Sequence, residues 1–186
     1  MYAMTEAGTE QDHVDRFLET LRERLPDLDL DVEGIVDRIN GLNRRFKRMM
    51  ELTLADQGLT VEEWTVMNKL HQAGPSFSLS PGQLARRLEL TSGAMTARLD
   101  RLEEAGLVRR SPDPDDRRGL KIELTEAGMR KYQEATGAQA EKEAFVAAAL
   151  SDHEKDELNA LLRRLMLQFE RTEPGGPGRS ERSTLP

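Results

Sequence analysis

Apolar side chains recur every three or four residues along most of the chain, with polar residues between them, which is the period of amphipathic helices. The pattern predicts a first helix from Asp12 to Leu25, ended by Pro26. A longer helix follows, with an apolar stripe from Ile35 to Met50. The last stripe, Leu158 to Phe169, has the same period. The second and third stripes are too apolar for one small domain to cover, so we expect them to pair in a two-fold dimer.

Helix start signals divide the chain between these stripes. Three capping boxes, in which a hydroxyl residue is followed three positions later by Glu or Gln, begin helices at Thr60, Ser80 and Ser151. Single hydroxyl caps at Thr91 and Thr125 predict two more helices. The helix after Ser80 is short, about two turns, and the helix after Thr91 buries Met95, Leu99 and Leu102 on one face. The sequence therefore predicts a mainly α protein.

The period changes from helix to strand between Gly106 and Thr125. Leu120, Ile122 and Leu124 alternate with charged residues, so "LVRRSP" and "LKIELT" read as two strands, with "DPDDRRG" as the tip of their hairpin. Helix, short helix, helix and hairpin, in this order, are the elements of a winged helix-turn-helix. We expect the helix that begins at Thr91 to enter a DNA major groove.

The exposed face of the helix that begins at Thr91 starts with small polar residues, which allow DNA to approach closely, and continues to arginine. At the hairpin tip, Arg118 is suited to the narrow minor groove, and Asp116 to holding that side chain extended before DNA arrives. Arg86 on the short helix is equally consistent with a phosphate contact or a solvated surface position. The predicted DNA-binding residues are Arg86, Ser92, Thr96, Ala97, Arg101, Asp116, Arg117 and Arg118.

The run "GAMTARLDRLEEAGLVRRSPDPDDRRGLKIELTEAG" resembles the recognition helix, wing and following helix of the MarR family of winged helix-turn-helix regulators. The family's wing signature, Asp-x-Arg-Gly, corresponds to Asp116 through Gly119. The resemblance implies a homodimer with a dimerisation domain built from the N- and C-terminal helices. It also implies a pseudo-palindromic DNA operator, more often repression than activation, and a small effector that weakens DNA binding.

The added N-terminal helix is similar to that of the urate-responsive branch of this family. In that branch a tryptophan of the added helix, an aspartate of the helix that corresponds to the one beginning near Thr60, and an arginine of the recognition helix receive the anionic purine. Arg98 matches the arginine, whereas Leu21 and Thr65 stand at the other two positions. This departure argues against urate and for another small anionic or aromatic effector, bound near Leu21, Trp64, Thr65 and Arg98. The sequence favours a core anchor over a ligand-stacking wall as the role of Trp64.

Composition and charge narrow the class further. The net charge is −7, but nine basic and seven acidic residues fall between Pro81 and Lys121, so the predicted DNA-binding segment is the basic part of an acidic chain. There are no cysteines, and three isolated histidines lack metal-site spacing, so neither a metal nor a cofactor is expected. Catalytic motifs are also missing, which argues against an enzyme. The acidic net charge leaves a winged-helix protein-interaction module as the alternative.

These patterns predict five regions along the 186 residues. They are a flexible N-terminus (1–11), N-terminal helices for dimerisation (12–57), the winged helix-turn-helix (58–125), C-terminal dimerisation helices (126–170) and a disordered tail (171–186). No apolar run reaches the ~20 residues that span a bilayer, so we expect a cytoplasmic, nucleoid-associated protein.

Overall fold

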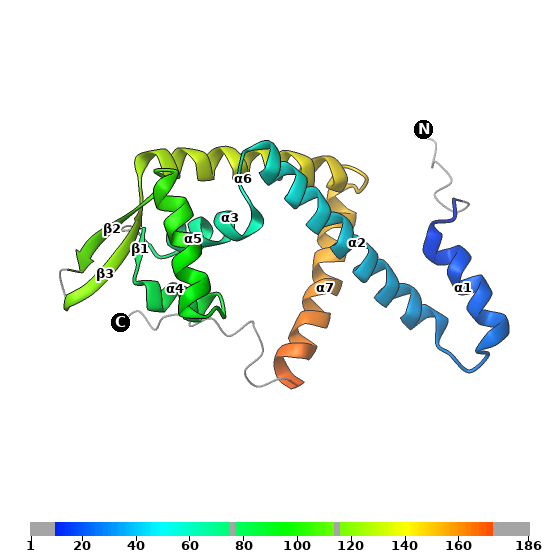
Figure 1. The fold of residues 1–186 in the computed structure, drawn as a ribbon. Helices are drawn as coiled ribbons and strands as arrows, with labels where there is room; N and C mark the ends of the chain where they lie inside the picture. Colours follow the sequence, from blue (N-terminus) through cyan, green and yellow to red (C-terminus); the bar gives the residue numbers. More distant parts are fainter. Residues whose placement is uncertain (1–9, 75–76, 114–115, 173–186) are drawn as a thin grey trace. The chain divides into compact units, whose positions relative to one another are not determined.

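The computed structural model describes residues 10–74, 77–113 and 116–172, and for residues 116–118 the backbone alone. The predictions for the flexible N-terminus and the tail fall almost entirely outside the described residues. The elements in chain order are α1 (His13–Arg24), α2 (Leu30–Asp56), α3 (Val61–His71), β1 (Ser78–Leu79), α4 (Pro81–Arg87), α5 (Ser92–Glu104), β2 (Val108–Asp113), β3 (Asp116–Leu124), α6 (Glu126–Ala147) and α7 (Asp152–Thr172) (Figure 1). The mainly helical winged fold is confirmed.

The chain divides into two compact units, Met1–Met50 and Glu51–Pro186, with α2 running through the boundary. In the first unit α1 lies against α2, and Val14 is its most buried apolar residue, 2% exposed. Asp12 caps α1 in a capping box with Asp15, and its side chain also accepts from Arg38 of α2. The sequence pattern did not reveal this carboxylate cap.

The second unit holds the main core. Its largest fully buried apolar side chains come from the end of α2, from α3, α4 and α5, and from the sheet: Leu54, Val66, Met67, Leu70, Leu84, Met95, Leu99, Leu102 and Ile122. The three α5 residues predicted to face inward are among them, each at most 2% exposed. Burial of one face fixes which residues of α5 are left on the surface.

Local start signals agree with the structure. Capping boxes are formed at Thr60 with Glu63 and at Ser80 with Gln83, and Thr91 caps α5 by accepting from the Ala94 N–H at 3.3 Å. Ser151 and Glu154 also exchange hydrogen bonds at the start of α7. These short-range patterns set the helix boundaries of the winged domain.

The sheet has one more strand than the two-stranded hairpin that the sequence predicts. Its order is β1-β3-β2, all antiparallel, with Ser78 opposite Glu123 and Leu79 opposite Ile122. The sequence pattern predicts no strand at these two β1 residues. They form a strand because β3, distant in sequence, offers unpaired backbone groups that a buried edge must satisfy.

Gly128 lies where α6 meets the start of the hairpin. A Cβ built on it would lie 1.9 Å from the Leu107 carbonyl oxygen, so only glycine allows this close approach. The sequence pattern treats Gly128 and Gly137 alike, as weak points in α6. The structure separates them, because a Cβ at Gly137 would meet nothing within 4 Å.

Helix α7 extends through Thr172, two residues into the segment predicted to be a disordered tail. None of its residues is buried within the chain. Its apolar stripe is exposed, from 40% at Leu162 to 62% at Phe169. Such a stripe on the surface of a single chain indicates an interaction surface.

Candidate nucleic-acid interface

Helix α5 presents its polar face to solvent, as the sequence predicts. Ser92, Thr96, Ala97 and Arg101 are exposed, and the opposite face is buried in the core. Thr91 caps the N-terminus of α5, where these small residues begin. Because short side chains cover the first turns, another surface can approach the helix backbone closely there.

Arg101 has a protein partner in this structure. Its Nε donates to Glu63 Oε1 at 3.3 Å, while the other Glu63 oxygen accepts the Thr60 N–H at 3.0 Å. One carboxylate thus caps α3 and pairs with α5. The Arg101 side chain is still 54% exposed, so the ion pair leaves it accessible to an outside partner.

Helix α4 carries Arg86 and Arg87, both exposed. Leu84 and Ala85 on the same short helix are buried, which fixes the helix against the core. Within the described part of the chain neither guanidinium has a carboxylate partner. Arg86 therefore remains available for a phosphate contact.

The hairpin tip is shorter than the sequence predicts. The sequence predicts a seven-residue turn over residues 113–119. In the structure, β2 continues through Asp113 and β3 begins at Asp116, and these two residues are register partners. The register passes from Pro112 opposite Leu120 to Asp113 opposite Asp116, so Arg117, Arg118 and Gly119 form an irregularity in β3. Backbone pairing across the hairpin accounts for the difference. The side chains of Asp116, Arg117 and Arg118 lie outside the described part.

The two arginines of β2 point to different partners. Arg109 pairs with Glu123, its register partner on β3, at 2.7 Å. Arg110 contacts α5, where it pairs with Asp100 at 2.5 Å and also with Glu103. The hydrogen bond that Arg109 donates lowers the pKa of Glu123, and the hydrogen bonds that Arg110 donates to Asp100 and Glu103 raise the pKa of Arg110. From the sequence alone, Arg109 and Arg110 are equally consistent with phosphate contacts and with solvated positions.

The predicted effector residues belong to both units, Leu21 to the first and Trp64, Thr65 and Arg98 to the second. The Thr65 hydroxyl donates to the Val61 carbonyl at 2.6 Å, and Arg98 is half-buried on α5. Trp64 stacks on Tyr132 of α6 with ring centroids 6.1 Å apart. Grouping of the four residues into one site stays a prediction.

Three polar atoms that the sequence did not single out are buried without a hydrogen-bond partner within the described residues: Trp64 Nε1, Thr136 Oγ1 and Gln139 Oε1. Tyr132, Thr136 and Gln139 repeat at helical spacing, so they share one face of α6. Unsatisfied buried polar groups are rare in native proteins and often mark a functional site.

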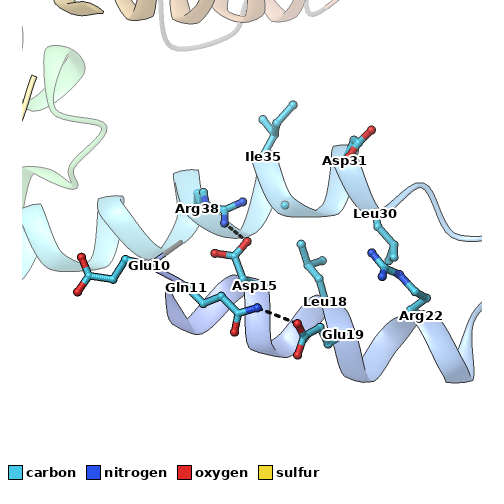
Figure 2. Close-up of a pocket in the computed structure, with 11 residues that line it drawn as sticks. Glu10, Gln11, Asp15, Leu18, Glu19, Arg22, Leu30, Asp31, Ile35 and Arg38 are labelled. Atoms are coloured by element: carbon cyan, nitrogen blue, oxygen red, sulfur yellow. Dashed lines mark hydrogen bonds and ion pairs between the residues drawn. The ribbon is translucent and has the colours of Figure 1, made fainter. Parts of the chain in front are cut away.

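A groove of about 720 Å³ lies between α1 and α2 in the first unit (Figure 2). Its lining is mostly charged, and the polar groups hold one another: Arg38 contacts Asp12 at 3.0 Å and Asp15 at 2.6 Å, and Gln11 donates to Glu19 at 2.9 Å. The Arg38 contacts join the added helix α1 to α2.

Among the described residues, no three histidine or carboxylate side chains are grouped to hold a metal ion. In the same part of the chain, no helix has the length and hydropathy that a membrane span requires.

The helix pair, the exposed face of α5 and the hairpin together define a winged helix-turn-helix protein. A model of the MarR family matches residues 59–120. The HTH-type transcriptional regulator PecS of Dickeya dadantii (strain 3937) is 30% identical over 144 residues, which cover 77% of this chain and 87% of PecS. The YusO protein from Bacillus subtilis superposes with a TM-score of 0.66 at 25% identity, covering 76% of this chain and 98% of YusO. The C80S mutant of MarR from E. coli, complexed with operator DNA, superposes with a TM-score of 0.56 at 24% identity, covering 78% of this chain and 96% of that one.

The chain belongs to the MarR family of transcriptional regulators.

Proposed function

We propose that this protein is a homodimeric, effector-responsive repressor that binds a pseudo-palindromic operator, with α5 in the major groove and Arg118 in the minor groove. One observation carries the proposal: α5 buries Met95, Leu99 and Leu102 and leaves its small polar residues exposed, next to a hairpin. A helix held this way can insert into a groove of ~12 Å width without rearrangement. Regulation of transcription through DNA, rather than catalysis, is the activity that this surface supports.

The wing test uses two variants and a duplex enriched from a random pool by the wild-type protein. Arg118→Ala weakens binding by about 1–3 kcal/mol, the value of one good groove contact. Arg130→Ala is the control, because it removes an exposed arginine of α6 whose side chain is 66% accessible. Equal affinity of R118A and the wild type, with R130A also unchanged, would refute the minor-groove role.

Asp116 acts through Arg118 in this proposal. Asp116→Ala therefore weakens binding in the same direction, and the double variant loses less than the sum of the two single losses. Additive losses would show that the two side chains act independently.

The homodimer is supported by apolar stripes in each unit that the rest of the chain does not cover. In the first unit, Ile35, Ile39 and Leu42 are each more than 40% exposed, and α7 is exposed throughout. Sedimentation velocity tests this directly. Leu162→Glu shifts the protein toward the monomer, whereas Asn159→Glu on the same helix leaves the dimer intact. A monomeric wild type would refute the two-fold operator.

Effector binding is proposed from three buried polar atoms that have no partner within the described residues: the N–H donor of Trp64, the hydroxyl of Thr136 and the amide oxygen of Gln139. We propose that a small aromatic carboxylate reaches these groups, with Arg98 as the candidate partner for its charge. Urate is not the expected effector, because Leu21 and Thr65 replace the tryptophan and aspartate of the urate-responsive branch.

Trp64 is the single tryptophan, so tryptophan fluorescence reports on the surroundings of this one side chain. Salicylate and urate are titrated into the wild type and into Gln139→Leu, with Gln133→Leu, an exposed glutamine of the same helix, as the control. We expect salicylate to change the emission of the wild type and of Q133L more than that of Q139L. A response to urate alone, at micromolar concentration, would overturn the assignment of effector class.

The alternative, a winged-helix protein-interaction module, has the acidic net charge of −7 in its favour. It predicts that R118A and the wild type behave alike toward every duplex. We propose location at the nucleoid in the cytoplasm because a repressor binds operator DNA there. If the protein does not bind DNA, this location is no longer expected.

A further inference from the structure

Arg110 is the point at which the wing is fastened to α5. Its Nη2 lies 2.5 Å from Asp100 Oδ1, and its Nη1 contacts Glu103 Oε2. The main chain takes part as well, because the Arg110 N–H donates to Glu103 Oε1 at 3.2 Å. Glu103 therefore holds both the side chain and the backbone of one residue of β2.

The two carboxylates lie on one side of α5, three residues apart, and Asp100 is on its exposed polar face. An unpaired carboxylate there would repel DNA phosphates. The Arg110 guanidinium neutralises that charge and is itself only 28% exposed. Because its donors are already engaged with two carboxylates, Arg110 is a poor candidate for a phosphate contact.

The rest of the hairpin is fastened internally. Arg109 pairs with Glu123, the Ser111 hydroxyl donates to the same carboxylate at 3.0 Å, and Lys121 pairs with Asp113 at 3.2 Å. These contacts join β2 to β3, so the hairpin moves as one body. Within the described residues, Arg110 makes the side-chain ion pairs that join this body to α5.

We propose that Arg110, through Asp100 and Glu103, is a positioning residue that sets the angle between the recognition helix and the wing, and thereby the preference for specific DNA. This inference rests on the proposed DNA binding. Base readout by α5 and minor-groove insertion by the wing must occur in one register, since contacts made only one at a time forfeit the gain from preorganisation. A loosened hairpin still attracts phosphates but no longer favours one sequence.

The first test measures the angle without DNA. The chain contains no cysteine, so Ala97→Cys on α5 and Leu120→Cys on β3, both at exposed positions, give two clean spin-label sites. Double electron–electron resonance on labelled protein, diluted in excess unlabelled protein, gives the distance distribution between helix and wing. We expect Arg110→Gln to broaden it and Arg109→Gln to leave it unchanged. An unchanged distribution in R110Q overturns the positioning role.

The second test measures DNA preference with unlabelled protein. The probes are a duplex enriched from a random pool by the wild type and an unrelated duplex of the same length. R110Q lowers the preference for the enriched duplex about tenfold or more, the scale of one lost base contact, while affinity for the unrelated duplex is maintained. Asp100→Asn lowers the preference in the same direction, and the double variant loses no more than R110Q alone.

A general loss of fold does not mimic this result. Thermal unfolding of each variant is followed alongside, and Arg110→Lys, which keeps the charge but not the forked geometry, restores part of the preference. Equal weakening on both duplexes, with a smaller salt dependence, would instead make Arg110 a phosphate contact and refute positioning. If the wild type enriches no duplex, the proposed DNA binding fails, and the spin-label distances alone decide whether Arg110 sets the angle.

Discussion

Gly128→Ala tests how tightly α6 is fitted to the base of the wing. The new Cβ would lie 1.9 Å from the Leu107 carbonyl oxygen and 2.9 Å from its carbonyl carbon. Backbone must therefore move by at least about 1.1 Å to reach the 3.0 Å that real Cβ contacts respect. The same oxygen accepts the Thr125 N–H at 3.1 Å, so the displacement also weakens the N-terminal cap of α6.

Overpacking of this kind costs about 1–3 kcal/mol, and a strained hydrogen bond adds about 1 kcal/mol. Alanine returns about 1 kcal/mol in helix propensity, so we expect a net loss of about 1–3 kcal/mol in the free energy of unfolding. Gly137→Ala in the same helix is the matched control and is neutral or stabilising, because its Cβ meets no atom within 4 Å.

The assay is urea denaturation of both variants at one protein concentration, followed by circular dichroism, because the stability of a dimer depends on concentration. G128A as stable as G137A would refute the close contact between α6 and Leu107.

Three further predictions concern the caps and ion pairs. Asp12 has its pKa lowered to about 2, mainly by the hydrogen bond from the Asp15 N–H and then by Arg38, so its support of α1 is complete above about pH 4 and is lost as the pH falls toward 2. Carboxyl NMR titration of Arg38→Gln shows this pKa returning only part of the way to 3.8; full return would contradict the backbone contribution. Glu63→Gln strengthens duplex binding and steepens its salt dependence by about one counterion, since it frees Arg101, and anisotropy titrations with an unchanged slope would contradict this. Thr91→Ala lowers the free energy of unfolding by about 1 kcal/mol, whereas Thr91→Ser does not; equal stability in urea would argue against the α5 cap.

Features encoded over three or four residues could be predicted from the sequence. The capping boxes at Thr60 and Ser80, the cap at Thr91 and the buried stripe of α5 depend on local spacing, and the winged fold follows from their order. Strand β1 could not be predicted in this way, because two residues form a strand only when β3 is beside them. The carboxylate partners of Arg110 could not be predicted either, since a surface arginine can bind phosphate or carboxylate.

In the candidate DNA interface too, features set by local spacing could be predicted, whereas contacts between distant elements could not. Exposure of Ser92, Thr96, Ala97 and Arg101 follows from helical periodicity and is confirmed. The pairing of Arg101 with Glu63 depends on how α3 crosses α5, which no local pattern specifies. The stacking of Trp64 on Tyr132 likewise arises from contact between α3 and α6, helices far apart in the sequence.

In the proposed complex, two copies of α5 and the wing read one DNA duplex. Selection of bound sequences from a random pool by the purified full chain tests it most directly. We predict enrichment of a pseudo-palindrome whose half-sites lie about one helical turn, ~10 base pairs, apart. A pool that stays random, or a single site without two-fold symmetry, would contradict it.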